Sequence, residues 1–163
     1  MIKLFEQFNE YSQVKSWLDD MGIKNYTIND DLTVDVDGDV RIGQKEDMTE
    51  LPIQFRKVYG SFFVVECGLT TLKGGPSYVA KNYNVSFNKI TSLKYAPKEM
   101  GWAFSTYENP LPKELDRFRE SYSINTILKH QEEYGIWNSD GSFNKERWNI
   151  FLQDCKNNII DTE

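Results

Sequence analysis

Several residue types that build common functional sites are scarce in this sequence. Its 163 residues include two cysteines, Cys67 and Cys155, and one histidine, His130. So few residues cannot supply a Cys/His metal cluster or a disulfide framework by themselves. We therefore expect no metal and no cofactor, and we expect both cysteines to be buried and inert.

Long apolar runs are also missing. The longest, at residues 61–65, falls far short of the roughly 20 residues that a membrane-spanning helix needs. The segment from Met1 to Glu6 has neither a continuous apolar region nor a small-residue cleavage site, so no secretory signal is visible. The sequence therefore predicts a cytoplasmic protein with no membrane partner.

Basic residues are outnumbered by acidic ones. The chain has 19 Lys and Arg against 25 Asp and Glu, which gives a formal net charge of −6. A protein that follows the phosphates of a nucleic acid needs a basic face. The charge argues against direct nucleic-acid binding, and is compatible with a basic partner or with ordinary solubility.

What the sequence does contain is an internal repeat. Apolar residues recur at steps of 21 positions, in the series Met48, Leu69, Ile90, Leu111 and in the series Val58, Val79, Met100. A period near 20 residues is typical of a solenoid, in which each repeat buries its apolar side against its neighbours. The first repeat fits only with one extra residue between Ile42 and Met48.

Each repeat begins with alternating apolar residues, which predicts a short strand with alternate side chains inward. A small polar residue follows at a fixed position and suits a buried ladder of hydrogen bonds to the turn backbone. The inward residues are Phe62, Val64, Tyr83, Val85, Phe104 and Thr106, and the ladder residues are Cys67, Asn88 and Asn109, with Glu46 in their place in the first repeat.

This pattern resembles the leucine-rich repeat, L-x-x-L-x-L-x-x-N/C-x-L, over residues 38–112. The short period and the recurrent Pro76 and Pro97 are most similar to the bacterial short-repeat type. The resemblance implies parallel strands on one side and an extended, non-helical chain on the other. It departs from the family in placing aromatic residues at Phe62, Tyr83 and Phe104, where leucine is usual.

The flanks of the array predict caps. Residues 1–37 contain an amphipathic helix from Phe8 to Gly22, followed by a small hairpin. Residues 113–163 predict a C-terminal helical cap or interaction region, with a helical segment from Glu114 to Glu133 that breaks near residues 121–123 and a last helix from Asn144 to Asn157. We therefore expect an α+β fold: a short solenoid with parallel strands, an N-terminal helix and hairpin, and C-terminal helices.

The surface that the pattern identifies is the outward side of the strands. It places aromatic and apolar side chains on a face that solvation alone would keep polar, which is typical of a binding hot spot. A register error of one residue would instead place Phe63 and Val65 in the core. The candidate partner-binding residues are Arg41, Phe63, Val65, Glu66, Asn84, Ser86, Phe87, Ser105, Tyr107 and Glu108, with Gly43 and Gln44 aligned in the first repeat.

No catalytic residues are identified, and we expect a non-enzymatic protein-binding module. The stretch from Trp17 to Asn29 also resembles uncharacterised repeat proteins of large tailed bacteriophages. That resemblance implies a phage protein that acts in the cytoplasm of an infected bacterium and inhibits or redirects a host defence or toxin protein.

Two other classes stay open. One is a structural protein that forms a homodimer through Trp137, Trp148 and Phe151 of the C-terminal helices. The other is an enzyme with a site between the solenoid and those helices, for which the candidate residues are His130, Glu133 and Tyr134.

Overall fold

The computed structural model describes residues 7–43 and 48–162. The expectations for Met1–Glu6, Gln44 and Glu46 lie outside these residues. The helices are α1 (Tyr11–Asp20), α2 (Lys113–Arg119), α3 (Ile124–Tyr134) and α4 (Lys145–Lys156). The strands are β1 (Tyr26–Ile28), β2 (Thr33–Val36), β3 (Val40–Gly43), β4 (Gln54–Val58), β5 (Phe62–Val65), β6 (Tyr78–Val79), β7 (Tyr83–Asn84), β8 (Glu99–Met100) and β9 (Phe104–Ser105).

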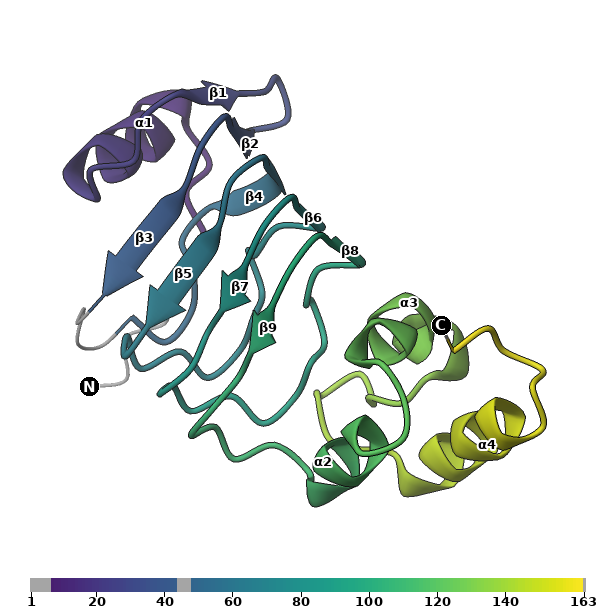
Figure 1. Ribbon diagram of the computed structural model, residues 1–163. Helices are drawn as coiled ribbons and strands as arrows, with labels where there is room; N and C mark the ends of the chain where they lie inside the picture. Colours follow the sequence, from purple (N-terminus) through teal and green to yellow (C-terminus); the bar gives the residue numbers. More distant parts are fainter. Residues whose placement is uncertain (1–6, 44–47, 163) are drawn as a thin grey trace, which may run out of the picture.

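The central part of the chain is a β-solenoid with parallel strands, so the α+β solenoid architecture is confirmed (Figure 1). Each turn of the solenoid, here called a coil, contributes one strand to each of two sheets. The four-stranded sheet has the order β3-β5-β7-β9 and holds the strands that the repeat pattern predicts. The five-stranded sheet has the order β1-β2-β4-β6-β8 and was not predicted, because each of its later coils offers a single recurring apolar position, Val79 or Met100, and no alternation.

The irregular first repeat is confirmed by the strand register. Gly43 pairs with Val65, a step of 22, whereas the backbone N–H of Thr70 donates to the carbonyl of Thr49, a step of 21. Coil one therefore has one residue more between Gly43 and Thr49 than coil two has between Val65 and Thr70. On the five-stranded sheet, the pairing of β2 with β4 shifts by one residue between Val34 and Val36. This shift compensates for the extra residue of coil one.

Aromatic side chains stack along the core at the positions where a leucine-rich repeat has leucine. The rings of Phe62 and Tyr83 are 5.5 Å apart and 12° from parallel, and those of Tyr83 and Phe104 are 5.2 Å apart and 6° from parallel. Phe55 meets Phe62 edge-on at 5.6 Å. Because parallel strands place equivalent residues one above another, a single aromatic position per coil generates the whole stack.

Tyr83 should make the fold sensitive to alkaline pH. Burial raises the pKa of its hydroxyl far above the ordinary value. Below the unfolded-state pKa of about 10, both states keep the proton and stability is unaffected. Above it only the unfolded chain ionises, so stability falls by up to about 1.4 kcal/mol per pH unit.

We expect the variant Tyr83→Phe to lose less stability than the wild type when the pH is raised from neutral to above about 10. Urea denaturation midpoints of both proteins at the two pH values measure this difference. Equal losses in the two proteins would show that Tyr83 does not carry the effect.

Hydrogen bonds from the polar repeat position form a ladder through the core, as predicted. The Asn88 Oδ1 accepts from the backbone N–H groups of Cys67 and Leu69, at 3.0 and 3.2 Å. Its Nδ2 donates to the carbonyls of Val64 and Val85, each at 2.8 Å. One amide side chain therefore satisfies four backbone groups that belong to two coils.

Helical segments cover both ends of the solenoid (Figure 1). At the N-terminal end, α1 buries Val14 and Leu18, and β1 pairs antiparallel with β2. At the other end, α3 contacts β8. The predicted break is confirmed, because α2 ends at Arg119 and Ser123 caps α3 by accepting from the backbone N–H of Asn125. Within the described residues, no helix is long and apolar enough to cross a membrane.

Candidate functional site

The first predicted outward row lies on the four-stranded sheet as expected. Arg41, Phe63, Asn84 and Ser105 pair with one another across β3, β5, β7 and β9. The Arg41 guanidinium carbon lies 4.4 Å from the centre of the Phe63 ring, which is a cation–π contact. Phe63 and Val65 are half-buried rather than core residues, so the predicted register holds.

The second row is broken at Ser86. This side chain was expected to face solvent, but it is 2% exposed, and that expectation is wrong. The reason is that β7 ends at Asn84, whose Oδ1 accepts from the backbone N–H of Ser86 and turns the chain. The Ser86 Oγ then accepts from the backbone N–H of Tyr107, so Ser86 connects two coils and is not available to a partner.

The third row lies beyond the strand ends. Glu66, Phe87 and Glu108 have φ of 57°, 59° and 55°, the left-handed region, at the same position of three successive coils. The left-handed backbone interrupts the alternation of the strand, so that Glu66, Phe87 and Glu108 are exposed one position before the inward ladder residues. The backbone N–H of Phe87 donates to the carbonyl of Tyr107 at 2.8 Å, so the two aromatic residues are neighbours. Their exposed fractions are 57% and 70%.

The remaining apolar residues of the three rows lie on the four-stranded sheet and at its adjacent turn. We call the set Arg41, Phe63, Val65, Phe87 and Tyr107 the aromatic surface, with Glu66 and Glu108 at its border. It combines half-buried apolar side chains on the strands with two exposed aromatic rings at the adjacent turn. An exposed apolar cluster with charged residues at its border is typical of a surface that contacts another macromolecule.

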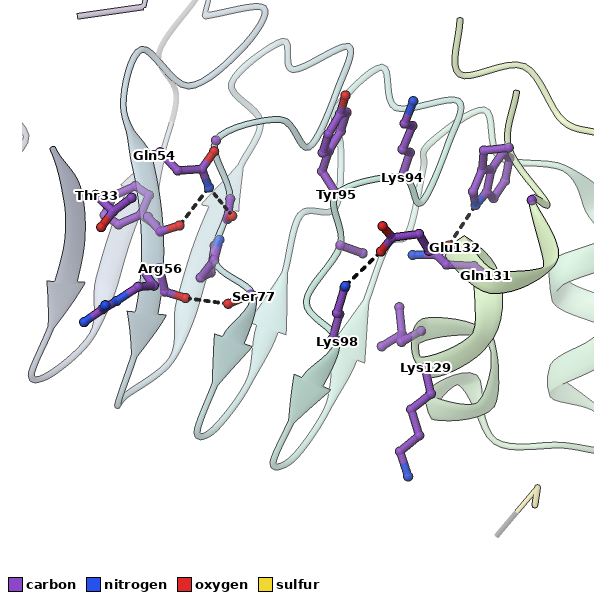
Figure 2. Close-up of a pocket in the computed structure, with 18 residues that line it drawn as sticks. Thr33, Gln54, Arg56, Ser77, Lys94, Tyr95, Lys98, Lys129, Gln131 and Glu132 are labelled. Atoms are coloured by element: carbon purple, nitrogen blue, oxygen red, sulfur yellow. Dashed lines mark hydrogen bonds and ion pairs between the residues drawn. The ribbon is translucent and has the colours of Figure 1, made fainter. Parts of the chain in front are cut away.

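A second candidate site lies between the solenoid and α3, and Figure 2 shows it in close-up. We call this cavity of about 410 Å³ the α3 pocket. Its apolar lining comes from Phe55, Pro76 and Ala96 on the solenoid side and from Leu128 and Trp137 on the helical side. This volume is within the range of small-molecule sites, roughly 300–1,000 Å³.

Polar contacts fix the two walls of the α3 pocket relative to each other. The Gln131 Nε2 donates to the carbonyl of Leu93 at 2.9 Å, and its Oε1 accepts from the Trp137 Nε1 at 2.8 Å. The Lys98 ammonium pairs with Glu132 at 2.8 Å and holds the pKa of that carboxyl below its usual value. These bonds hold α3 and the following segment against the solenoid.

The residues proposed for an enzyme lie elsewhere. His130, Glu133 and Tyr134 do not line the α3 pocket. The Nδ1 of His130 lies 3.3 Å from the Glu133 carboxylate. The Tyr134 hydroxyl donates to Asp154 of α4 at 2.7 Å, and this bond is the main cause that raises the pKa of Tyr134 to about 12. The bond from Tyr134 to Asp154 joins α3 to α4.

The residues proposed for a dimer interface are buried within one chain. Phe118 meets Trp148 edge-on at 5.5 Å and packs against Phe151 at 5.4 Å, and Trp137 packs against Phe143 at 5.5 Å. Trp137, Trp148 and Phe151 are all buried, so their side chains hold the helical region together. They cannot at the same time form the contact surface of a second copy.

Residues 7–43 and 48–162 contain no group of three or more His, Cys, Asp or Glu side chains placed to hold a metal ion. Both cysteines are buried as expected, and burial raises the pKa of the Cys155 thiol. Comparison of the chain with protein families, with curated proteins and with solved structures finds no match.

Sequence reasoning missed the residues of the α3 pocket, although one signal was present. Tyr95 stands 21 positions after Gly74, and both have positive φ, 71° and 90°. A bulky aromatic residue thus occupies a left-handed position where the preceding coil has glycine. This exchange can be seen in the aligned repeats, and it identifies the loop that forms the wall of the pocket.

Proposed function

We propose that this chain is a protein-binding module that uses the aromatic surface. The observation that supports it most is the pair Phe87 and Tyr107, adjacent and largely exposed on a rigid, hydrogen-bonded array. Aromatic side chains dominate protein interfaces because they bury a large area at a low cost in conformational entropy.

The backbone at Phe87 strengthens this proposal. A left-handed conformation costs a non-glycine residue about 1–2 kcal/mol, and asparagine tolerates it best after glycine. The equivalent positions of the neighbouring coils hold Glu66 and Glu108. A bulky, exposed aromatic residue at this position does not help the fold, so a role in binding is the better explanation.

The proposed mechanism is occlusion: the module covers a surface that its partner needs. The partner class that we propose is a bacterial host protein of defence or toxin function, and this rests on the resemblance to phage repeat proteins alone. Membership of the leucine-rich-repeat class likewise stays a prediction from the residue pattern.

The variant Phe87→Asn tests the proposal because it should stabilise the fold and at the same time weaken partner binding. We expect the free energy of unfolding to rise by about 1 kcal/mol, since asparagine suits the left-handed backbone. We expect affinity for a captured partner to fall by about 30-fold, the effect of removing one hot-spot residue. Urea denaturation gives the first quantity. Pull-down from bacterial lysate, followed by titration of the purified partner, gives the second.

Tyr11→Ser is the matched control, because Tyr11 has the same exposed fraction as Phe87, 57%, but lies on α1. It should leave partner affinity unchanged. A partner that binds Phe87→Asn and wild type equally, or no partner that binds the wild type, would rule out the aromatic surface as the binding site.

A further inference from the structure

Donors from coil one satisfy a group of carbonyls at the wall of the α3 pocket. The backbone N–H of Phe55 donates to the carbonyl of Gly74 in coil two at 2.8 Å. The Gln54 Nε2 donates to the carbonyls of Phe55 and Gly75, at 2.8 and 3.0 Å, and Figure 2 shows these two bonds. All four residues line the pocket. Between coil one and coil two, three carbonyls of this wall therefore have a donor.

One coil later, both donors are absent. The residues 21 positions after Gln54 and Phe55 are Gly75 and Pro76. Glycine has no side chain, and proline has no backbone N–H. The equivalent carbonyls are those of Pro76, Tyr95 and Ala96, which also line the pocket. Within residues 7–43 and 48–162, no group donates a hydrogen bond to these three carbonyls. The wall therefore offers acceptors that a ligand with N–H groups would satisfy.

The space beside these carbonyls is open. Apart from its chain neighbours, a Cβ on Gly75 would have two atoms of the described residues within 4 Å. They are the carbonyl oxygens of Leu72, at 3.0 Å, and of Tyr95, at 3.9 Å. A ligand at this point would therefore take the place that the Gln54 side chain takes one coil earlier, with the same kind of acceptor beside it.

The charges of the pocket favour an uncharged donor. Its cationic lining residues are Arg56, Lys94, Lys98 and Lys129, and Glu132 is the one carboxylate among the described lining residues. The Lys94 ammonium donates to the carbonyl of Ser139 at 3.3 Å, and Lys98 pairs with Glu132. A cationic donor such as an amidinium would be repelled by these ammonium groups, and a carboxylate has no hydrogen to donate to a carbonyl. A neutral amide or amino group meets both conditions.

We propose that the α3 pocket binds an uncharged, planar aromatic molecule that carries a carboxamide or an amino group. The N–H groups of this ligand donate to the carbonyls of Pro76 and Ala96, as the Gln54 amide donates to those of Phe55 and Gly75. Its ring lies on the apolar lining between the solenoid and α3. The volume of about 410 Å³ accommodates a ligand of two fused rings and a substituent. This site is separate from the aromatic surface and does not depend on the proposed protein partner.

Naphthamide is the probe, and methyl naphthoate, an uncharged ester of similar size without an N–H group, is its matched control. By titration calorimetry with the wild type we expect a single site for naphthamide. The ester should bind about tenfold more weakly, because it cannot make the two hydrogen bonds to the carbonyls. Naphthamidine, which is cationic, should also bind more weakly than the amide. Equal affinity for amide and ester, tighter binding of the amidine, or no binding of the amide would each overturn the proposal.

The variant Gly75→Gln locates the site, because it supplies the amide from the chain itself. Its side chain should donate to the carbonyl of Ala96, as Gln54 donates to that of Gly75, and so fill the place of the ligand. Gly75→Ala is the matched variant, since its Cβ meets the same Leu72 carbonyl without adding an amide. We expect Gly75→Gln to bind naphthamide about tenfold more weakly than Gly75→Ala does.

Urea denaturation provides a second readout. Gly75→Gln should have a higher urea midpoint than Gly75→Ala, because its amide gives the Ala96 carbonyl a donor. Phe87→Asn controls for adsorption to the aromatic surface and should bind naphthamide as the wild type does. Equal binding to the two folded Gly75 variants, or a loss of binding in Phe87→Asn, would contradict the proposal. If the Gly75 variants do not fold, the comparison of amide with ester in the wild type decides it.

Discussion

Replacing Asn88 with alanine should lower the free energy of unfolding by about 4 kcal/mol, because it leaves several buried backbone groups without a partner. Its amide satisfies two N–H groups and two carbonyls at once, from the coil of Cys67 and from its own coil. Each unpaired buried group costs roughly 1–3 kcal/mol, and water that enters the new space recovers part of that sum.

Asn109→Ala is the matched control. Asn109 makes three equivalent bonds one coil later, accepting from the backbone N–H of Ile90 and donating to the carbonyls of Val85 and Thr106, but it lies nearer the end of the solenoid and is half-buried. Water can replace its bonds more easily, so we expect a loss of about 1–2 kcal/mol. Urea denaturation of both variants gives the comparison. Similar losses at the two positions would mean that the burial of the asparagine side chain does not determine how much it contributes to the free energy of unfolding.

The second large effect is expected at Gly60, in the turn that joins the five-stranded to the four-stranded sheet. A Cβ on Gly60 would lie 2.5 Å from the carbonyl carbon and oxygen of Gly38, and it would also overlap the Asp39 carboxylate. These atoms belong to the neighbouring coil, and the Asp39 Oδ1 accepts from the backbone N–H of Ser61 at 2.8 Å. We expect Gly60→Ala to cost about 3 kcal/mol or more.

Gly101→Ala tests whether the position of a coil along the solenoid determines the loss of stability. A Cβ on Gly101 would overlap the carbonyl oxygen of Ala80 even more severely. Gly101, however, follows β8, the last strand of its sheet, so its coil can move away from its single neighbouring coil. We therefore expect the smaller loss at Gly101 by thermal or urea denaturation. A larger loss there would show that the solenoid does not relax at its end.

The repeat period allowed much of this fold to be predicted. Inward positions such as Phe62 and Tyr83, the Asn88 ladder and the extra residue of the first repeat all follow from the alignment of equivalent residues. The second sheet does not follow from it. β6 and β8 each carry one recurring apolar position, Val79 and Met100, whereas the coil of β7 alternates from Tyr83 to a second inward residue, Val85.

The errors at the candidate sites have local causes. Ser86 was misplaced because the Asn84 side chain ends the strand, and side chain–backbone bonds of this kind are not visible in an apolar pattern. The α3 pocket was missed because its two walls, near Tyr95 and Trp137, are about 40 residues apart in the sequence. Their contact depends on α3 docking against the solenoid, which includes the bond from Gln131 to the carbonyl of Leu93.

The constant step between coils also governs how this chain can change in length during evolution. Loss of residues 62–82 would join Ser61 to Tyr83, bring Tyr83 opposite Val40 and place Asn88 where Cys67 now lies. The pairing of β3 with the next strand of its sheet would be kept, whereas loss of a single residue inside a strand would shift the later side chains of that strand to the opposite face. Duplication and deletion of whole coils are thus the changes in length that this architecture tolerates, and they would move the C-terminal helices along the axis without altering them.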